Sequence, residues 1–169
     1  LQKAQLVSEF VNRETINLGT ASLPTQSGTV DDAAAHGQVL LHTARDVLLS
    51  TMLQSMTSVQ EKVIIDCNNE STRRPAEARG TSHAERLAAD APNTHIVKAF
   101  NTISQEIFEY CPQELSQFQV SCFICGDDDQ AVNTVTDLAQ EIGFAAIQCG
   151  PLRNARLLEG FGDFIRVMI

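Results

Sequence analysis

Short apolar runs alternate with longer amphipathic stretches along most of the chain. The runs lie at residues 38–43, 62–66, 94–99, 119–125 and 145–148. Nearly continuous apolar runs of this length are typical of strands that are buried on both faces of a sheet. A further short strand is predicted at 15–18, followed by a turn-rich stretch that reaches Gly28.

The segments between these runs have helical periodicity and helix boundary signals. Thr29 is a capping residue, while Pro92 and the glycines at 37 and 143 are typical of helix ends. Residues 67–82 are polar and predict a long loop, and Pro112 predicts the start of a turn. The predicted helices cover 2–13, 29–36, 47–56, 84–91, 103–109, 128–143 and 152 to the end.

This alternation predicts an α/β fold with a mostly parallel sheet and helices on both faces. No internal repeat is visible and no shift in composition divides the chain. We therefore expect one domain over residues 1–169.

The charge and the apolar content of the chain exclude some classes of binding partner. The chain has 12 basic and 21 acidic residues, a formal net charge of −9. An acidic chain lacks the basic face that nucleic-acid binding and docking on anionic membranes require. No run approaches the roughly 18 apolar residues of a membrane-spanning helix, and no signal peptide is visible. We expect neither nucleic acid nor membrane as partner, and an odd count of five cysteines favours the reducing cytoplasm.

Two groups of potential metal ligands have a structural interpretation. Cys122 and Cys125 form a C-x-x-C motif inside a predicted strand, where residues three apart point to opposite faces. Such a pair is more typical of a buried strand than of a redox or zinc site. Asp127, Asp128 and Asp129 precede a predicted helix, and we interpret them as capping residues rather than metal ligands. We predict no metal site.

Neutral hydrogen-bonding side chains follow several of the predicted strands. In open parallel sheets, ligands bind beyond the carboxyl ends of the strands. Side chains of this kind suit a small polar ligand such as a nucleotide, although asparagine and threonine are also ordinary turn and cap residues. His42 fits either a satisfied core position or a site. The residues are His42, Thr43, Asn68, Asn69, Asn101 and Thr102.

Three motifs in the second half of the chain indicate a resemblance to a known family. They are Val97-Lys-Ala-Phe-Asn-Thr-Ile103, Cys125-Gly-Asp-Asp-Asp129 and Gly150-Pro-Leu-Arg-Asn-Ala-Arg-Leu-Leu-Glu159. In this order and spacing, the chain resembles the coenzyme F-420-dependent NADP oxidoreductase family, the deazaflavin-linked NADPH reductases. Val63-Ile-Ile-Asp-Cys-Asn-Asn69 fits an earlier strand of that family, and the resemblance covers roughly residues 29–169.

The resemblance implies a Rossmann-like fold, NADP(H) as cofactor, and hydride transfer between the nicotinamide and a deazaflavin or flavin-like acceptor. It implies a small-molecule redox substrate and a homodimer whose interface includes the C-terminal helix that follows Gly150. No catalytic acid, base or nucleophile is expected, because hydride transfer uses the electronics of the cofactors. The implied cofactor-binding residues are His42, Thr43, Ala44, Arg45, Asn68, Phe100, Asn101, Thr102 and Ile103.

The glycine-rich phosphate loop of this family is missing from the sequence. None of the nine glycines falls in a Gly-x-Gly-x-x-Gly pattern. We therefore expect an NADP-binding domain that lacks its first βαβ unit, with an unpaired edge on the 38–43 strand. Residues 1–169 alone should bind NADPH with a dissociation constant on the order of 100 µM, and the 169 residues should be inactive or weakly active. The alternatives are a non-catalytic paralogue that serves dimerisation or partner binding, and an α/β module for another metabolite.

Overall fold

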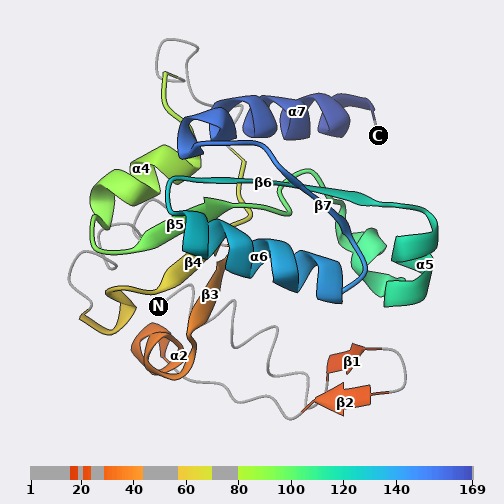
Figure 1. The fold of residues 1–169 in the computed structure, drawn as a ribbon, viewed down its shortest axis with the longest axis horizontal. Helices are drawn as coiled ribbons and strands as arrows, with labels where there is room; N and C mark the ends of the chain where they lie inside the picture. The colour runs from red at the N-terminus through yellow and green to blue at the C-terminus, as the bar shows by residue number, and fades with distance from the viewer. Residues whose placement is uncertain (1–15, 19–20, 24–28, 44–56, 70–79, 169) are drawn as a thin grey trace.

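The computed structural model describes residues 16–18, 21–23, 29–43, 57–69 and 80–168 (Figure 1). The predicted helices at 2–13 and 47–56 lie outside these residues.

A five-stranded sheet forms the centre of the described chain. Its spatial order is β3-β4-β5-β6-β7, the same as the order in sequence. Adjacent strands run parallel, except that β5 and β6 are antiparallel. This confirms the predicted α/β fold with a mostly parallel sheet. The strands are β3 (Val39–His42), β4 (Val63–Asp66), β5 (His95–Lys98), β6 (Ser121–Gly126) and β7 (Ala145–Gln148).

Helices cover both faces of this sheet (Figure 1). One face packs under α4 (His83–Asp90) and α7 (Ala155–Met168), and the other packs under α6 (Asp129–Glu141). Because side chains alternate along a strand, neighbours in sequence divide between the two cores. Ile64 lies in the core beneath α4 and α7, whereas Ile65 lies in the core beneath α6.

The two C-x-x-C cysteines follow the same alternation. Cys125 lies in the core on the α4 and α7 side, and Cys122 lies in the core on the α6 side. Burial raises the pKa of the Cys122 thiol to about 11 and that of Cys125 to about 12. Two inert thiols on opposite faces match the predicted structural role.

Local capping explains where the helices begin. Thr29 and Ser82 form capping boxes with acidic residues three positions later, at the start of α2 (Val30–His36) and of α4. Asp128 accepts a hydrogen bond from the backbone N–H of Ala131 at 2.7 Å. This confirms the predicted capping role for Asp128, whereas Asp127 accepts a hydrogen bond from the backbone N–H of Leu152 at 2.8 Å and Asp129 is the first residue of the helix.

Several smaller elements differ from the prediction. The stretch predicted as turn contains a second strand, and β1 (Ile16–Leu18) pairs antiparallel with β2 (Ala21–Leu23) in a separate two-stranded sheet. The predicted helix at 103–109 is a 3-10 helix over Gln105–Glu109, and Pro112 begins a short helix, α5 (Pro112–Gln117). Proline suits the first helical turn, where its missing N–H has no partner to lose. Further 3-10 turns lie at Thr57–Val59 and Leu152–Asn154.

Strand β3 lies at one edge of the five-stranded sheet. Among the described residues it pairs only with β4, and Leu41 on it is 57% exposed. Within the described part of the chain, β3 is therefore an edge strand. No helix in this part is both long and apolar enough to cross a membrane.

Candidate functional site

Three adjacent parallel strands end in ionisable residues that stand in register. His42 lies opposite Asp66, and Asp66 lies opposite Lys98. In each strand, the residue two positions earlier packs in or against the core beneath α4 and α7. Because side chains two positions apart in a strand lie on the same face, all three ionisable side chains point toward α4 and α7. Their exposed fractions are 1% or less. The carboxyl ends of the strands therefore carry a buried row of ionisable side chains.

Asp66 accepts hydrogen bonds at both carboxylate oxygens. Oδ1 accepts from His42 Nδ1 and from Asn68 Nδ2, each at 2.9 Å. Oδ2 accepts from His83 Nδ1 at 3.1 Å and from Lys98 Nζ at 2.8 Å. Burial by itself would raise the pKa of Asp66, but the hydrogen bonds from His42 and His83 and the charge of Lys98 hold that pKa well below its usual range. Asp66 is therefore a buried carboxylate at neutral pH.

Lys98 joins the strand ends to helix α7. Its Nζ donates to Glu159 Oε1 at 2.7 Å and to the backbone oxygen of Asn68. The other oxygen of Glu159 accepts from the backbone N–H of His83 at 3.0 Å, at the start of α4. A carboxylate at that end also meets the positive pole of the helix dipole. The buried ammonium of Lys98 on β5 thus links this strand to β4 and to α7. Through its second oxygen, Glu159 also links α7 to the start of α4.

Asn101 lies just beyond the end of β5 and is also buried. Its Nδ2 donates to Asn69 Oδ1 at 2.7 Å and to the backbone oxygen of Leu158 at 2.8 Å. Asn69 Nδ2 in turn donates to the backbone oxygen of Asn101 at 3.0 Å. Because both partners of Nδ2 are acceptors, the orientation of the amide is determined. Asn101 Oδ1 is then a buried acceptor with no donor among the described residues.

Phe100 turns away from this network. Its backbone has a φ of 60°, in the left-handed region that non-glycine residues seldom adopt. Its ring packs against Phe108 and Phe144, with centroids 6.1 and 5.9 Å away, in the core on the α6 side. The turn at Phe100 therefore separates an aromatic cluster on one face from Asn101.

The structure brings some of the predicted site residues together and separates others. Asn68 donates to the backbone oxygen of His42 at 3.1 Å, and Asn69 links this pair to Asn101. Thr43 is exposed at the end of β3, while Thr102 and Ile103 are half-buried beyond β5. Ala44 and Arg45 lie outside the described residues.

The sequence interpretation missed four charged or titratable residues of the network: Asp66, His83, Lys98 and Glu159. It favoured neutral side chains at the strand ends, although an available signal was the ionisable residue that ends each of the runs Val39–His42, Val63–Asp66 and His95–Lys98. Glu159 has a weaker signal, an acidic residue among the buried positions 155, 158 and 162 of an amphipathic helix.

The network also contains a group with potential metal ligands. The donor atoms of His42, Asp66 and His83 lie within 4.8 Å of one another. The Lys98 ammonium, however, is 2.8 Å from the same Asp66 oxygen that His83 contacts. A fixed positive charge at that distance opposes a second cation, so the arrangement favours hydrogen bonding.

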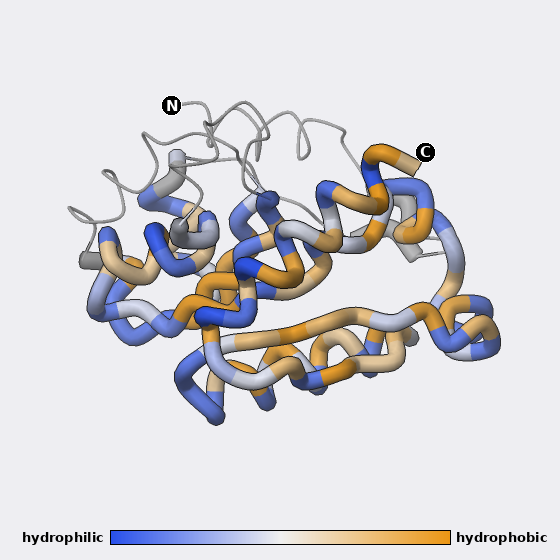
Figure 2. The backbone as a smooth tube through the Cα atoms, turned by 90° about the horizontal axis from the view of Figure 1, so that it is seen from above, coloured by the Kyte–Doolittle hydropathy of each residue, from blue (hydrophilic) through white to orange (hydrophobic). Residues whose placement is uncertain are grey.

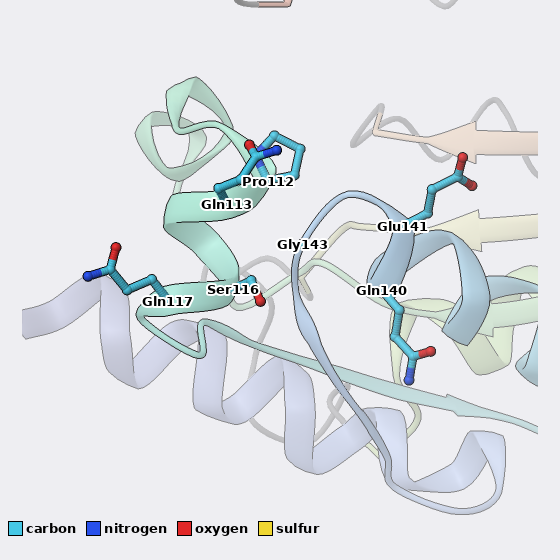
Figure 3. A pocket seen from close by; sticks show the side chains of 7 residues that line it. All are labelled: Pro112, Gln113, Ser116, Gln117, Gln140, Glu141 and Gly143. Atoms are coloured by element: carbon cyan, nitrogen blue, oxygen red, sulfur yellow. The ribbon is translucent and has the colours of Figure 1, made fainter.

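A separate hollow of about 480 Å³ lies between α5 and the end of α6 (Figure 3). Gly143 shapes its wall, because a Cβ at this residue would lie 2.3 Å from the backbone oxygen of Pro112. None of the predicted site residues line it. The lining residues are Pro112, Gln113, Ser116, Gln117, Gln140, Glu141 and Gly143.

Two glycines of α7 provide a matched test of how this helix supports Asn101. A Cβ at Gly162 would lie 2.7 Å from Asn69 Oδ1, whereas a Cβ at Gly160 meets nothing within 4 Å. We expect Gly162→Ala to lower the unfolding free energy by about 1–3 kcal/mol, because it displaces the Asn69 side chain. Gly160→Ala should raise it by about 0.5–1 kcal/mol through helix propensity. Urea unfolding of both variants measures this, and equal effects would contradict the packing described here.

Proteins with known names are similar in sequence to this chain, two of them over most of its length. The chain is 30% identical to the F420-dependent NADP reductase of Methanothermobacter thermautotrophicus over 167 residues, which cover 92% of this chain and 68% of the relative. It is also 30% identical to the enzyme of the same name from Methanothermobacter marburgensis, over 92% of this chain and 70% of the relative. Rat metalloreductase STEAP3 is 34% identical over 98 residues, which are 58% of this chain and only 19% of that protein. No family model matches the chain.

Solved structures agree on the fold. A protein of Arthrobacter sp. FB24 designated an F420-dependent NADP reductase superposes with a TM-score of 0.66 at 21% identity, over 83% of this chain and 67% of its own. An imine reductase from Myxococcus stipitatus superposes with a TM-score of 0.56 at 15% identity, over 86% of this chain and 46% of its own. These likenesses indicate a Rossmann-like architecture. By sequence identity and coverage of its relatives, the chain belongs to the F420-dependent NADP reductase family.

Proposed function

We propose that this protein is an NADP(H)-dependent oxidoreductase that transfers a hydride between the nicotinamide and a deazaflavin or flavin-like acceptor. The observation that carries the proposal is the buried oxygen of Asn101, which lies beyond the end of β5 and has no donor among the described residues. Its position fits the place where ligands bind in parallel sheets, and two relatives carry the name F420-dependent NADP reductase.

The residues at the strand ends suit the nicotinamide half of the cofactor. Asn101 Oδ1 accepts a hydrogen bond and cannot donate one, so it matches an amide or ring N–H. Its own amide is held by Asn69 and Leu158, which gives the acceptor a constant direction. The cofactor would supply the hydride chemistry, while the protein orients the two rings and excludes water. Within the described residues we assign no binding site for the phosphates of NADP(H).

The direct test is reduction of candidate acceptors by NADPH. The purified protein is mixed with NADPH and, in separate reactions, with coenzyme F-420, with FMN and with a ferric chelate, and the loss of NADPH absorbance is followed. Reduction of F-420 or FMN supports the proposal, and NADH in place of NADPH is the control for cofactor choice. The assay uses a version of the protein with the missing βαβ unit restored, because residues 1–169 alone are expected to be inactive or weakly active. Failure of that version to reduce any acceptor would favour the non-catalytic paralogue.

We also propose that two copies of the chain associate through α7. Residues Ala155, Leu158, Glu159 and Gly162 of this helix are buried, but several of its other apolar residues are exposed. Hydrophobic positions recur along α7 up to its end (Figure 2). Exposed apolar rows of this kind commonly mark interfaces. The residues are Leu157, Phe161, Phe164, Val167 and Met168, with exposed fractions from 43% to 86%.

A charged substitution in this row tests the dimer. Phe164 is 59% exposed, so Phe164→Glu should leave the fold intact and shift the protein to the mass of a monomer in sedimentation equilibrium. Phe118 is 68% exposed at the end of α5, so Phe118→Glu is a matched control that should leave the dimer unchanged. A monomeric unmodified protein would refute the interface.

We propose the cytoplasm as the compartment. All five cysteines are free thiols, which fits a reducing environment.

A further inference from the structure

A buried carboxylate orients a partly exposed imidazole at the edge of the candidate site. Asp66 is 0% exposed and accepts from His83 Nδ1 at 3.1 Å, while the His83 side chain is 19% exposed. Histidines that transfer protons are commonly held this way: one ring nitrogen donates a hydrogen bond to a carboxylate, and the other faces the reacting group. We propose that His83 supplies the proton that accompanies hydride transfer to the acceptor, an inference that rests on the proposed function.

The contacts of His83 leave its second ring nitrogen available. Nδ1 is engaged by Asp66, and the backbone N–H is engaged by Glu159. The ring also stacks on His42, with centroids 5.3 Å apart and planes at 20°. Among the described residues, Nε2 has no hydrogen-bond partner. The ring is therefore held at one nitrogen and on one face, while Nε2 is available to a ligand.

Helix α7 contacts both His83 and Asn101. The backbone oxygen of Leu158 accepts from Asn101 Nδ2, and the side chain of the next residue, Glu159, accepts from the backbone N–H of His83. Leu158 thus holds Asn101, the proposed acceptor of a ring N–H, and the adjacent Glu159 holds His83, the proposed proton donor. We therefore expect a ligand at the ends of β4 and β5 to reach both side chains.

Charged groups face His83 from several elements. Asp66 on β4 accepts from its Nδ1, and Glu159 on α7 accepts from its backbone N–H. Lys98 on β5 is shared between these two carboxylates. On α4 itself, Glu85 is engaged by Arg156 at 2.6 Å. Among the described residues, His42 on β3 also stacks on the His83 ring.

The reaction requires such a donor when the acceptor is a deazaflavin or a flavin. A hydride carries two electrons and one proton to the acceptor ring, which then holds an added negative charge. His83 gives the Nε2 proton to a ring nitrogen of the acceptor, and this neutralises the charge and leaves the imidazole neutral. Solvent then returns a proton to Nε2. In the opposite direction, neutral His83 accepts the proton.

Steady-state kinetics of the whole protein with NADPH and F-420 test this role. The unmodified rate of NADPH oxidation should fall as pH rises, because neutral histidine has no second proton to give. His83→Gln should lower kcat about 100-fold and flatten this dependence. Imidazole added to His83→Ala should restore part of the rate. His95 begins β5 at the opposite end of the strand, so His95→Gln is the matched control and should keep both the rate and the pH profile.

A second measurement needs no activity. In the unmodified protein, ¹⁵N NMR of the histidine rings should show the proton of neutral His83 on Nδ1, and Asp66→Asn should move part of it to Nε2. Full activity of His83→Gln with an unchanged pH profile would overturn the inference while leaving the proposed function intact. A His83 proton on Nε2 in the unmodified protein would overturn it as well. If the unmodified protein reduces neither F-420 nor FMN, the proposed function fails and the proton-donor role fails with it.

Discussion

Replacing Lys98 with methionine should lower the free energy of unfolding by about 3–5 kcal/mol. The ammonium is fully buried and donates to Asp66 and Glu159, whose carboxylates are themselves at most 3% exposed. Methionine has a similar length but no charge, so two buried carboxylates lose the cation that they share. Removing one partner of a buried ionic group leaves an uncompensated charge, which costs far more than an exposed ion pair contributes. Denaturant unfolding at neutral pH measures the loss.

Two further variants show whether charge causes this effect. Arg166 pairs with Asp163 at 3.5 Å and is 44% exposed, so Arg166→Met should change the stability by less than about 1 kcal/mol. Combining Lys98→Met with Glu159→Gln should recover part of the lost stability, because one of the two buried negative charges is removed. An additive loss in the double variant would show that packing, rather than charge, determines the effect.

In a version of the protein with the missing βαβ unit restored, replacing Asn101 with alanine should reduce kcat/KM for hydride transfer from NADPH by about 100-fold, a size of effect typical of small misplacements of reacting groups. The substitution removes the proposed acceptor Oδ1 and also the Nδ2 contacts with Asn69 and Leu158. The stability should fall by about 1–3 kcal/mol, since Asn69 Oδ1 loses a buried donor. The effect on catalysis should therefore exceed the effect on folding.

A surface asparagine provides the comparison. Asn133 on α6 accepts from Gln148 at an exposed position, so Asn133→Ala should leave both stability and kcat/KM nearly unchanged. NADPH oxidation and urea unfolding are measured on the same preparations of both variants. Unchanged kcat/KM in Asn101→Ala, with an active unmodified protein, would refute the assignment of Asn101 to the ring pocket.

Much of the fold was predictable because its signals are local. The run at 145–148 is a strand over the same residues, and the other four runs of the sheet agree to within two residues at each end. Capping residues such as Thr29 and Ser82 act within one turn of the helix that they begin. The prediction was wrong where short elements depend on partners. β2 exists through its pairing with β1, and the residues after Phe100 form a 3-10 helix instead of an α-helix.

The candidate site was only partly predictable. The ends of β3, β4 and β5 were expected to hold ligand-binding residues, and Asn68 and Asn101 do lie there in buried positions. Sequence reasoning favoured neutral side chains, since an isolated charge is costly to bury. It did not anticipate that the register of three strands places His42, Asp66 and Lys98 side by side.

By itself, the sequence determined the α/β class, most of the strands and helices, and the resemblance that sequence identity to named reductases confirms. These features depend on periodicity and on motifs, which are properties of neighbouring residues. Only the tertiary structure decided that Glu159, 61 positions after Lys98, completes the charge network, and that His83 and Asn101 are held by adjacent residues of one helix. The physical reason is that electrostatic and hydrogen-bond energies depend on distance in space and on burial, and neither is set until the helices pack on the sheet.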